Sequence, residues 1–535
     1  MHHDFNEEFR FGSARFAEPD ELRRAGMLKQ SPDALFVGFM DGKPIWYSGA
    51  GGLLLTAGAR GGKLRDLLAY NLCAGIYSSS VLVLDLKGEL AAISQDQTPE
   101  KKFCIYWNPL HLHGLPQHRI NPVENLRIDS PTLISDIKVF CENWITTSGS
   151  ANSAYFEQRA REFLEALCLT FVKRDGVLTL PALYGAINLI ARGGDAWLEF
   201  GFEMQESGFP LAARVEEEIA AGQNGQTGNG YQGVVGELFK SVACLSDPVL
   251  MKAVSPPFDF SLSKLCESDQ AYQLYMMAPA EFVRAWAPVI KAFFVSAMLF
   301  KSRAPTAPQQ TWVLDECGQL GGFPLITKLF TYGAGIGIRP WAVFQSTQQM
   351  NALGPNAASI ITSSAQLRSY FAVRDYATAN GISSMLGMQT LEYDDEVLHA
   401  RARQMKREAM QAFIGGSDPF AAGLSYAAGK EQASIRSKQH RALMTPDEIL
   451  NLGADRQIIF CDDVPAPILS ERAPYYEQAF MAGRYHPNPY HPPLDRVRVK
   501  TRWGSTWKPV IRERVPQAYA HYPQYADGYW SRIGR

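Results

Sequence analysis

The feature that most constrains the fold is a glycine-rich loop between an apolar strand and an amphipathic helix. The strand pattern GGLLLT begins at residue 51, the loop AGARGGK spans 57–63, and the helical pattern LRDLLAYNLCAGIY follows it. A second apolar run, SVLVLDLKGE from residue 80, has the composition of a buried parallel strand. Together these segments predict a strand–helix–strand unit, the building block of α/β folds.

The loop has the residue types that bind phosphate. Small residues let backbone N–H groups approach phosphate oxygens at a helix N-terminus, and a lysine there reaches the outer phosphates. Against the pattern G-x-x-x-x-G-K-[ST], Ala57 replaces the first glycine and Leu64 replaces the hydroxyl residue that ligates Mg²⁺. A glycine-rich turn with a surface lysine therefore remains the alternative. The predicted nucleotide-binding residues are Gly58, Arg60, Gly61, Gly62, Lys63 and Leu64.

Two later strand patterns end in polar side chains. TWVLDE ends in Asp315 and Glu316. In P-loop enzymes such an aspartate holds Mg²⁺ and the glutamate orients or deprotonates the attacking water. PWAVFQS places Gln345 at a strand end. There it either senses the γ-phosphate or bonds to a neighbouring loop, and both alternatives stay open. Asp85 ends the strand pattern VLVLD, and Lys87 follows two residues later. Both are expected to be structural.

Further strand patterns, namely AYQLYMMA, LRSYFAV and RQIIFCD, alternate with helical ones, and this predicts a mainly parallel, doubly wound α/β sheet. A chain of 535 residues is too long for one core. We predict a nucleotide-binding domain over 49–128 and 246–490, interrupted by an all-α domain over 129–245. An N-terminal segment, 1–48, precedes this domain and contains a short helix that begins near Pro19. A surface tail, 491–535, follows the domain.

Composition excludes several classes of protein. The eight cysteines are scattered without metal-site spacing, which indicates a reducing compartment and no zinc site. The longest apolar run, 288–300, carries Lys291 and is shorter than the roughly 18 residues that cross a membrane. We therefore expect no secretory signal and no membrane-spanning segment.

A net charge of −2 gives no overall attraction to nucleic acid, so only local basic stretches could bind it. The stretch 401–441 is expected to be a solvated charged surface, and its helical periodicity is weak. The stretch 496–514, which contains Trp503 and Trp507, either contacts single-stranded DNA or docks on a membrane or partner.

The order of motifs resembles that of the TraG-like coupling proteins of type IV secretion systems, from about residue 12 to 476. The segments that carry the resemblance are GSARFAEPDEL, AGARGGK, VLVLDLKGE, RINPV, WVLDECGQLG, FQSTQQMNALG, LRSYFAVRDYATANGISSMLG and RALMTPDEIL. The resemblance implies a RecA-like P-loop domain with an all-α domain, assembled as a hexamer on the cytoplasmic side of the inner membrane. It also implies ATP and Mg²⁺ as cofactors, and ATP-driven delivery of single-stranded DNA with its relaxase, or of effector proteins, to the channel ATPases and inner-membrane components.

The same resemblance implies roles for single residues. Lys63 and Gly62 become phosphate ligands in the Walker A loop, Asp315 and Glu316 the Walker B pair, and Gln345 a sensor. An arginine from a neighbouring subunit commonly completes such a site. The candidates are Arg339 and Arg374.

Two departures keep other functions open. The first departure is that family members usually begin with membrane-spanning helices, whereas none is predicted here. This chain is therefore expected to be cytoplasmic or peripheral to the inner membrane. Leu64 favours an alternative in which the protein is a nucleotide-binding adaptor with little or no ATP turnover. A pilus-assembly or chromosome-type translocase is a third hypothesis, disfavoured by the GSAR and RALMTPDEIL segments.

Overall fold

A computed structural model describes most of the chain. The described residues are 12–95, 102–146, 151–226, 229–393, 396–415, 419–432, 437–481, 484–490, 496–522, 525 and 528–533. The chain divides into two compact units. The larger one comprises Pro19–Ala372, Ala454–Asp463 and Leu469–Arg535, and the smaller one Met1–Glu18, Val373–Gly453 and Val464–Ile468.

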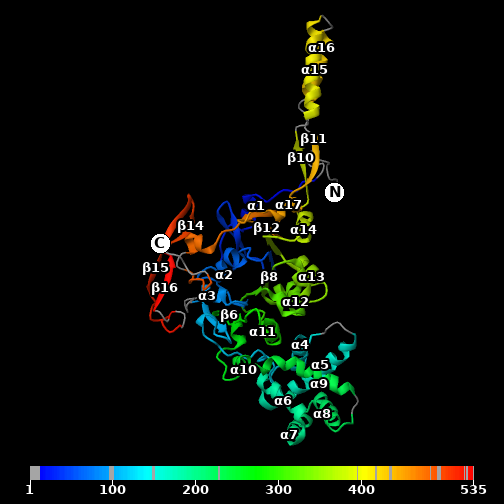
Figure 1. Cartoon of the computed structure of the whole chain (residues 1–535), viewed down its shortest axis with the longest axis vertical. Coiled ribbons are helices and arrows are strands. Elements are labelled where there is room, and N and C mark those ends of the chain that lie inside the picture. Colours follow the sequence, from blue (N-terminus) through cyan, green and yellow to red (C-terminus); the bar gives the residue numbers. More distant parts are fainter. Residues whose placement is uncertain are drawn as a thin grey trace. The chain divides into compact units, whose positions relative to one another are not determined.

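An eleven-stranded sheet, counted over the described residues, forms the centre of the larger unit (Figure 1). Its strand order is β2-β1-β13-β12-β9-β3-β8-β7-β4-β6-β5. In chain order the strands are β1 (Leu35–Met40), β2 (Lys43–Tyr47), β3 (Leu53–Ala57), β4 (Val81–Asp85), β5 (Lys102–Trp107), β6 (Ala271–Met277), β7 (Gln310–Asp315), β8 (Ile338–Phe344), β9 (Leu367–Phe371), β12 (Arg456–Cys461) and β13 (Val464–Glu471).

The strands from β9 to β5 in that order are all parallel to one another. The side chains of β3, β4 and β8 are buried on both faces, as is usual for the central strands of a parallel sheet. Because parallel strands end at one edge, the carboxyl ends of β3, β4, β7 and β8 lie together, and ligands bind at such an edge.

Most of the predicted strands are confirmed, with two differences. The strand predicted from RQIIFCD is β12, which runs antiparallel to β9, with Ile458 opposite Tyr370. The N-terminal segment holds more than the helix α1 (Pro19–Arg24), because β1 and β2 form a hairpin that joins the sheet. The segment LFVGFM is buried almost throughout, and on its own it did not distinguish this edge hairpin from a loop.

Between β5 and β6 the named elements of the described residues are all helical. They are η3 (Leu112–Gly114), α4 (Leu133–Trp144), α5 (Ala151–Asp175), α6 (Leu180–Arg192), α7 (Gly194–Glu206), α8 (Pro210–Gln223), α9 (Asn229–Val242), η4 (Ala243–Ser246), α10 (Pro248–Ala253) and η5 (Leu262–Cys266). Figure 1 shows α5 to α9 gathered in one bundle. This is the segment for which the sequence predicted an all-α domain.

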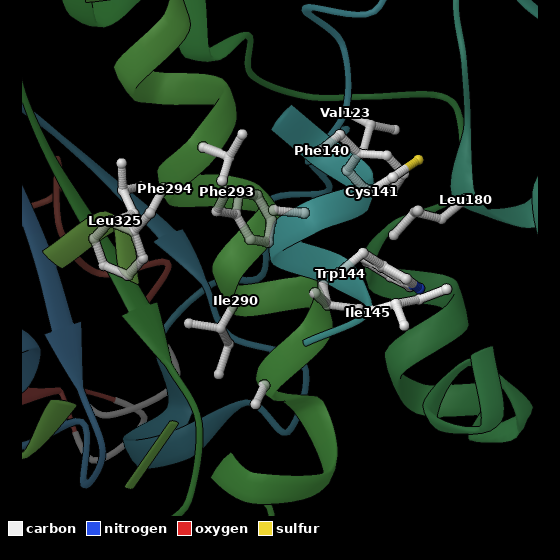
Figure 2. Close-up of a cluster of buried hydrophobic side chains, with 14 of the residues drawn as sticks. Val123, Phe140, Cys141, Trp144, Ile145, Leu180, Ile290, Phe293, Phe294 and Leu325 are labelled. Carbon is white, nitrogen blue, oxygen red and sulfur yellow. The ribbon is translucent and has the colours of Figure 1, made fainter. Parts of the chain in front are cut away.

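Helix α11 (Val283–Arg303) joins this bundle to the sheet through apolar packing. In Figure 2, Phe293 of α11 lies against helix α4, which carries Phe140 and Trp144. Elsewhere on α11, the Phe294 ring lies 5.5 Å from that of Trp312 in the sheet. A buried aromatic side chain contributes roughly 1.5–3 kcal/mol, so this shared core couples the bundle to the sheet.

The same helix α11 is the one described helix long and apolar enough to cross a membrane. However, 78% of its apolar window is buried inside the fold. Lys291 within it donates a hydrogen bond to the carbonyl of Gly322, with a length of 2.7 Å. These contacts match the buried core helix that the sequence predicted.

The smaller unit contains α14 (Tyr376–Leu386), α15 (Glu396–Ile414), α16 (Pro419–Gln432) and α17 (Pro446–Leu450). Its two-stranded antiparallel sheet pairs β10 (Met388–Tyr393) with β11 (Ser437–Ala442). Thr445 and Glu448 form a capping box at the start of α17, which explains the local pattern TPDE. The helical periodicity of 401–441 is weak, yet much of the described part of this stretch is helical, because α15 and α16 pack against each other.

The C-terminal segment is also more ordered than the predicted surface tail. Strands β14 (Arg496–Thr501), β15 (Gly504–Arg514) and β16 (Tyr529–Ile533) form an antiparallel sheet. Alternating polar and apolar residues such as RVRVK are typical of strands with one exposed face.

Candidate nucleotide-binding site

The phosphate loop connects β3 to a π-helical turn, η2 (Leu64–Leu68), which continues into α2 (Ala69–Leu72). Gly62 has a φ of 91°, and a Cβ there would lie 2.5 Å from Oδ2 of Asp66. A Cβ on Gly61 would lie 2.8 Å from both the Gly58 carbonyl oxygen and the Ala372 Cβ. These two positions therefore require glycine, and the glycines let the loop turn sharply at the carboxyl end of β3.

Lys63 lies between Asp315, the last residue of β7, and Glu316, which follows it. Its Nζ is 2.8 Å from Oδ1 of Asp315 and 2.8 Å from Oε1 of Glu316. The three side chains are between 15% and 18% exposed, so their charges are poorly screened by water. The sequence predicted that all three residues belong to one site, and the structure brings them together.

Burial and pairing shift the pKa values of these groups in different directions. Burial acts to raise the pKa of Glu316, but Lys63 and Gln345 outweigh it, so the pKa is lowered and the carboxylate stays ionised. Burial raises the pKa of Asp315 and exceeds the opposing effect of Lys63. Burial lowers the pKa of Lys63, yet the two acids together leave it raised. At neutral pH the lysine is therefore a fixed cation.

Two amides hold the carboxylate of Glu316. Gln345, which follows β8, donates from Nε2 to Oε1 at 2.9 Å. Gln319 donates from Nε2 to Oε2 at 2.6 Å, from the short helix η6 (Cys317–Leu320). The strand-end position indicates Gln345 from the sequence, whereas Gln319 lies in the turn after β7 and carries no such signal. Its three-residue spacing from Glu316 was the available signal.

The structure does not bring Arg339 into this group. Arg339 lies near the start of β8, roughly 20 Å along the strand from Gln345. It is fully buried and donates to the carbonyl oxygens of Gly49 and Asp33, each at 2.9 Å. A guanidinium enclosed in this way cannot reach a neighbouring subunit, so the expectation of a catalytic role is corrected to a structural one. Arg374 is exposed and belongs to the smaller unit.

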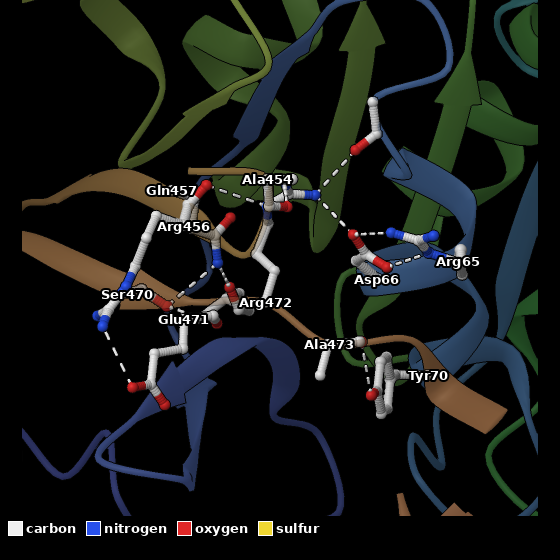
Figure 3. A network of polar contacts seen from close by, with 12 residues as sticks. Arg65, Asp66, Tyr70, Ala454, Arg456, Gln457, Ser470, Glu471, Arg472 and Ala473 are labelled. Atoms are coloured by element: carbon white, nitrogen blue, oxygen red, sulfur yellow. Dashed lines mark hydrogen bonds and ion pairs between the residues drawn. The ribbon is translucent and has the colours of Figure 1, made fainter. Parts of the chain in front are cut away.

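Arg472 supports the phosphate loop from a distant part of the chain (Figure 3). Its Nη1 donates to the Gly61 carbonyl oxygen at 2.9 Å and to Oδ2 of Asp66 at 2.6 Å. Both charged side chains are 1% exposed. The guanidinium also lies 3.7 Å from the ring centroid of Phe371, and burial lowers the pKa of Arg472 to about 10. No sequence pattern relates residues so far apart, so neither Arg472 nor Asp66 was predicted.

Arg65 shares the same aspartate. Its Nε donates to Oδ1 of Asp66 at 2.6 Å and its Nη2 to Oδ2 at 3.1 Å, so Oδ2 accepts from both Arg65 and Arg472. Because Asp66 sits in the first turn after Lys63, this network sets the direction in which the loop enters η2.

Asp85 ends β4 and caps the next turn, in agreement with its expected structural role. Its Oδ2 accepts from the backbone N–H of Ala91 at 2.8 Å. Burial raises the pKa of Asp85 to about 7, and the nearby charge of Asp315 adds to the effect. Lys87 is exposed, and its positive charge contributes to lowering the pKa of Glu316.

These residues line one cavity of about 1440 Å³, large enough for a nucleotide. One wall is the phosphate loop with Asp315, Glu316 and Gln345. The lining also includes aromatic rings from the C-terminal part of the chain. Its members include Tyr475, Tyr476, Tyr485 and Tyr490. Lys63 and the backbone N–H groups of the loop suit phosphates, and the tyrosine rings suit a base. The cavity therefore suits a ligand that has both.

The donor set also fits a magnesium ion held with a nucleotide. The described residues contain no group of three or more acidic, histidine or cysteine side chains placed to hold a metal. Mg²⁺ commonly uses one or two carboxylates, with water and substrate phosphates supplying the other ligands. Asp315 could supply such a carboxylate, whereas Leu64 has no hydroxyl to add.

Comparison with known proteins gave consistent matches. Residues 11–412 and 418–492 match the family described as type IV secretory system conjugative DNA transfer. The conjugal transfer protein TraG of Escherichia coli is 23% identical over 432 residues, which are 72% of this chain and 65% of the relative. TraG of Rhizobium radiobacter is 24% identical over 429 residues, 78% of this chain and 61% of the relative. The chain thus spans less than two thirds of the length of these relatives.

Solved structures share the fold. The plasmid coupling protein TrwB with the ATP analogue ADPNP superposes with a TM-score of 0.58 and 16% identity, covering 87% of this chain and 97% of TrwB. TrwB with ADP and Mg²⁺ has a TM-score of 0.55 and 16% identity, covering 86% and 94%. The predicted RecA-like P-loop α/β fold is therefore confirmed.

Proposed function

The chain belongs to the type IV secretory system conjugative DNA transfer family, and from this membership and its site we propose that it is an ATP-hydrolysing coupling protein. Its proposed task is to deliver single-stranded DNA with its relaxase, or a protein substrate, to a type IV secretion channel. ATP with Mg²⁺ is the proposed cofactor, since TrwB has been solved with ADP and Mg²⁺ and with an ATP analogue.

One observation carries the proposal: Nζ of Lys63 lies 2.8 Å from both Asp315 and Glu316. A fixed lysine charge above a glycine loop suits the outer phosphates of a nucleotide. When phosphates bind, Lys63 exchanges a carboxylate contact for a phosphate contact, which frees Glu316 to face water. Mg²⁺, held beside Asp315, would neutralise charge on the phosphates.

Glu316 is the proposed base. Because its pKa is lowered, it is ionised at neutral pH and can accept a proton from the attacking water. Gln345 and Gln319 hold one carboxylate oxygen each, so the side chain keeps a single orientation. A base must lie within hydrogen-bond reach of the proton it accepts, and these two amides fix that reach.

The test separates nucleotide binding from turnover. The purified chain is assayed for ATP hydrolysis with and without single-stranded DNA, and for binding of a fluorescent ATP analogue. We expect Lys63→Ala to lose both activities, and Glu316→Gln to bind the analogue but to lose hydrolysis. Lys328→Ala, an exposed lysine on helix α12 (Pro324–Tyr332) outside the cavity, is the matched control. Hydrolysis at the unaltered rate in both site variants would refute the assignment.

Leu64 favours a second candidate, a nucleotide-binding adaptor with little turnover. The residue after the phosphate lysine normally supplies a hydroxyl to Mg²⁺, and leucine cannot. This candidate predicts tight analogue binding and no hydrolysis under saturating Mg²⁺ and DNA. Leu64→Thr should then raise turnover, whereas no gain in that variant would count against it.

A ring is part of the proposal. We propose a homo-hexamer located at the cytoplasmic side of the inner membrane, in which an arginine of a neighbouring subunit completes each site. With Arg339 buried, Arg374 is the remaining candidate of the two. Mass in solution with and without nucleotide tests the ring. Arg374→Ala should lower hydrolysis without lowering nucleotide affinity if the assignment holds.

The proposed DNA contact includes the turn between β14 and β15. Trp503 there is 90% exposed, and the Arg502 guanidinium lies 5.4 Å from its ring centroid. Aromatic stacking with nearby positive charge suits sequence-neutral binding of single strands. Trp503→Ala is expected to weaken single-stranded DNA binding about fivefold or more, since one stacked base contributes roughly 1–3 kcal/mol. An unchanged DNA affinity would assign the turn to a partner or membrane instead.

A further inference from the structure

The paired helices α15 and α16 of the smaller unit, called the helical hairpin below, carry apolar side chains where one helix ends and the next begins. These side chains are between 50% and 78% exposed, far more than is usual for such residues. They are Met410, Ile414, Phe420, Leu424 and Tyr426. We call them the apolar end of the hairpin. A cluster of this kind marks a surface that binds something apolar.

Positive charge lies next to the apolar end along the helix axis. Arg401, Arg403 and Arg407 of α15 are exposed, Lys406 is half-buried and Glu408 is exposed, so basic residues outnumber the acid in 401–408 by four to one. In the sequence, residues 409–429 contain a single charged residue, Asp418. The charged residues of α15 are therefore separated from the apolar end along the length of the hairpin, and not by lying on a different face of it.

The spacing matches the depth of a lipid head-group layer. Seven residues separate Arg407 from Ile414 on α15, which is roughly 10 Å at 1.5 Å per residue. Interfacial helices bury apolar groups about 5–10 Å into the boundary between head groups and acyl chains. At the junction, Nζ of Lys406 lies 5.8 Å from the ring centroid of Tyr426. Aromatic and basic side chains are enriched at this depth of a bilayer.

We propose that the apolar end of the hairpin inserts into the surface of an anionic lipid bilayer, with the arginines of α15 contacting the head groups. The charge pattern distinguishes this partner from nucleic acid. Single strands stack on aromatic rings beside cations, whereas Met410, Ile414 and Leu424 are aliphatic and lie beyond the basic residues. Anionic lipid offers both an apolar interior and a negatively charged surface in the same order as the hairpin.

Vesicle flotation with the full chain tests the proposal. Vesicles of phosphatidylcholine are compared with vesicles in which about one third of the lipid is phosphatidylglycerol. We expect binding to the anionic vesicles only, weakened by salt. The double variant Ile414→Ser with Phe420→Ser should lower the affinity about tenfold or more. Arg401→Gln with Arg407→Gln should lower it about fivefold per arginine.

A matched control uses exposed apolar residues of another helix. Leu198 and Phe202 on α7 are 64% and 63% exposed, so Leu198→Ser with Phe202→Ser removes a similar surface. The control is expected to bind vesicles like the unaltered chain. Equal losses in both double variants, or equal binding to neutral and anionic vesicles, would overturn the proposal.

Two further readouts identify other occupants. If the Ile414/Phe420 variant lowers the mass in solution or the affinity for single-stranded DNA while vesicle binding is unchanged, the surface belongs to a second copy or to nucleic acid, and the proposal is overturned. The thermal midpoint of each variant shows that it is folded. Nucleotide binding is not involved in these measurements, so their outcome is independent of the proposed ATPase.

Discussion

Removing the Arg472 guanidinium should loosen the phosphate loop without substituting any predicted nucleotide-binding residue. Arg472→Met deletes the hydrogen bonds to the Gly61 carbonyl oxygen and Asp66, and also those to the carbonyl oxygens of Ala454 and Arg456. Breaking a fully buried ion pair costs about 3–5 kcal/mol. Because Arg65 still pairs with the same aspartate, we expect the lower end, about 3 kcal/mol.

In a unit of this size the loss gives a small change in melting temperature. With an unfolding entropy of about 2.1 cal/mol/K per residue over roughly 430 residues, about 3 kcal/mol corresponds to about 3 °C. Differential scanning calorimetry can measure this shift. The dissociation constant of a fluorescent ATP analogue should rise about tenfold, because the Gly61 peptide is no longer held.

A double-mutant cycle separates the ion pair from general damage. Asp66→Asn is combined with Arg472→Met, and the coupling energy should be at least about 1 kcal/mol, with the double variant less affected than the sum. Arg472→Lys, which keeps the charge but not the fork of donors, should recover part of the affinity. A coupling near zero, or an unchanged dissociation constant in Arg472→Met, would refute the role we give to this arginine.

Three other outcomes follow from the site. In the folded state the pKa of Asp85 is about 7, above the ordinary value of 3.8. Between about pH 4 and 7 the native state therefore holds a proton that the unfolded state releases, so the free energy of unfolding falls as the pH rises through this range. The thermal midpoint of Asp85→Asn should vary less across that range than that of the unaltered chain, and equal slopes would contradict the burial argument. Gln345→Ala should lower kcat about tenfold with little change in nucleotide affinity, because it removes one of two amides that orient Glu316, and a loss of affinity with kcat intact would assign it to binding. Gly62→Ala should weaken nucleotide binding by about 1–3 kcal/mol, since its φ of 91° and a Cβ 2.5 Å from Asp66 are both unfavourable to alanine, and wild-type affinity would show that the loop can shift.

The buried position of Arg339 illustrates how far a residue's type can mislead. From its residue type, Arg339 is a reasonable candidate for the arginine that one subunit contributes to the nucleotide site of its neighbour. Its guanidinium donates to the carbonyl oxygens of Gly49 and Asp33, which lie 290 and 306 positions away in the sequence. Which carbonyl groups need a donor depends on how the loops meet at the amino edge of the sheet, and no local pattern records that.

What the sequence by itself determined is the part of the site set by local geometry. An apolar strand, a loop of small residues and a helix predict where Lys63 points, because backbone direction follows from neighbouring residues. Asp315, Glu316 and Gln345 were placed with it because parallel strands end at one edge. The RecA-like fold could be predicted for the same reason, from strands that alternate with helices.

The tertiary structure alone decided which distant residues complete that site. Asp66 and Arg472 are 406 positions apart, yet they form a buried pair that holds the loop. The hairpin of β1 and β2, the helices α15 and α16 and the tyrosines of the cavity are likewise products of packing. Periodicity shows which face of an element is buried but not which element covers it, since many apolar faces are equivalent until the chain brings one of them into contact.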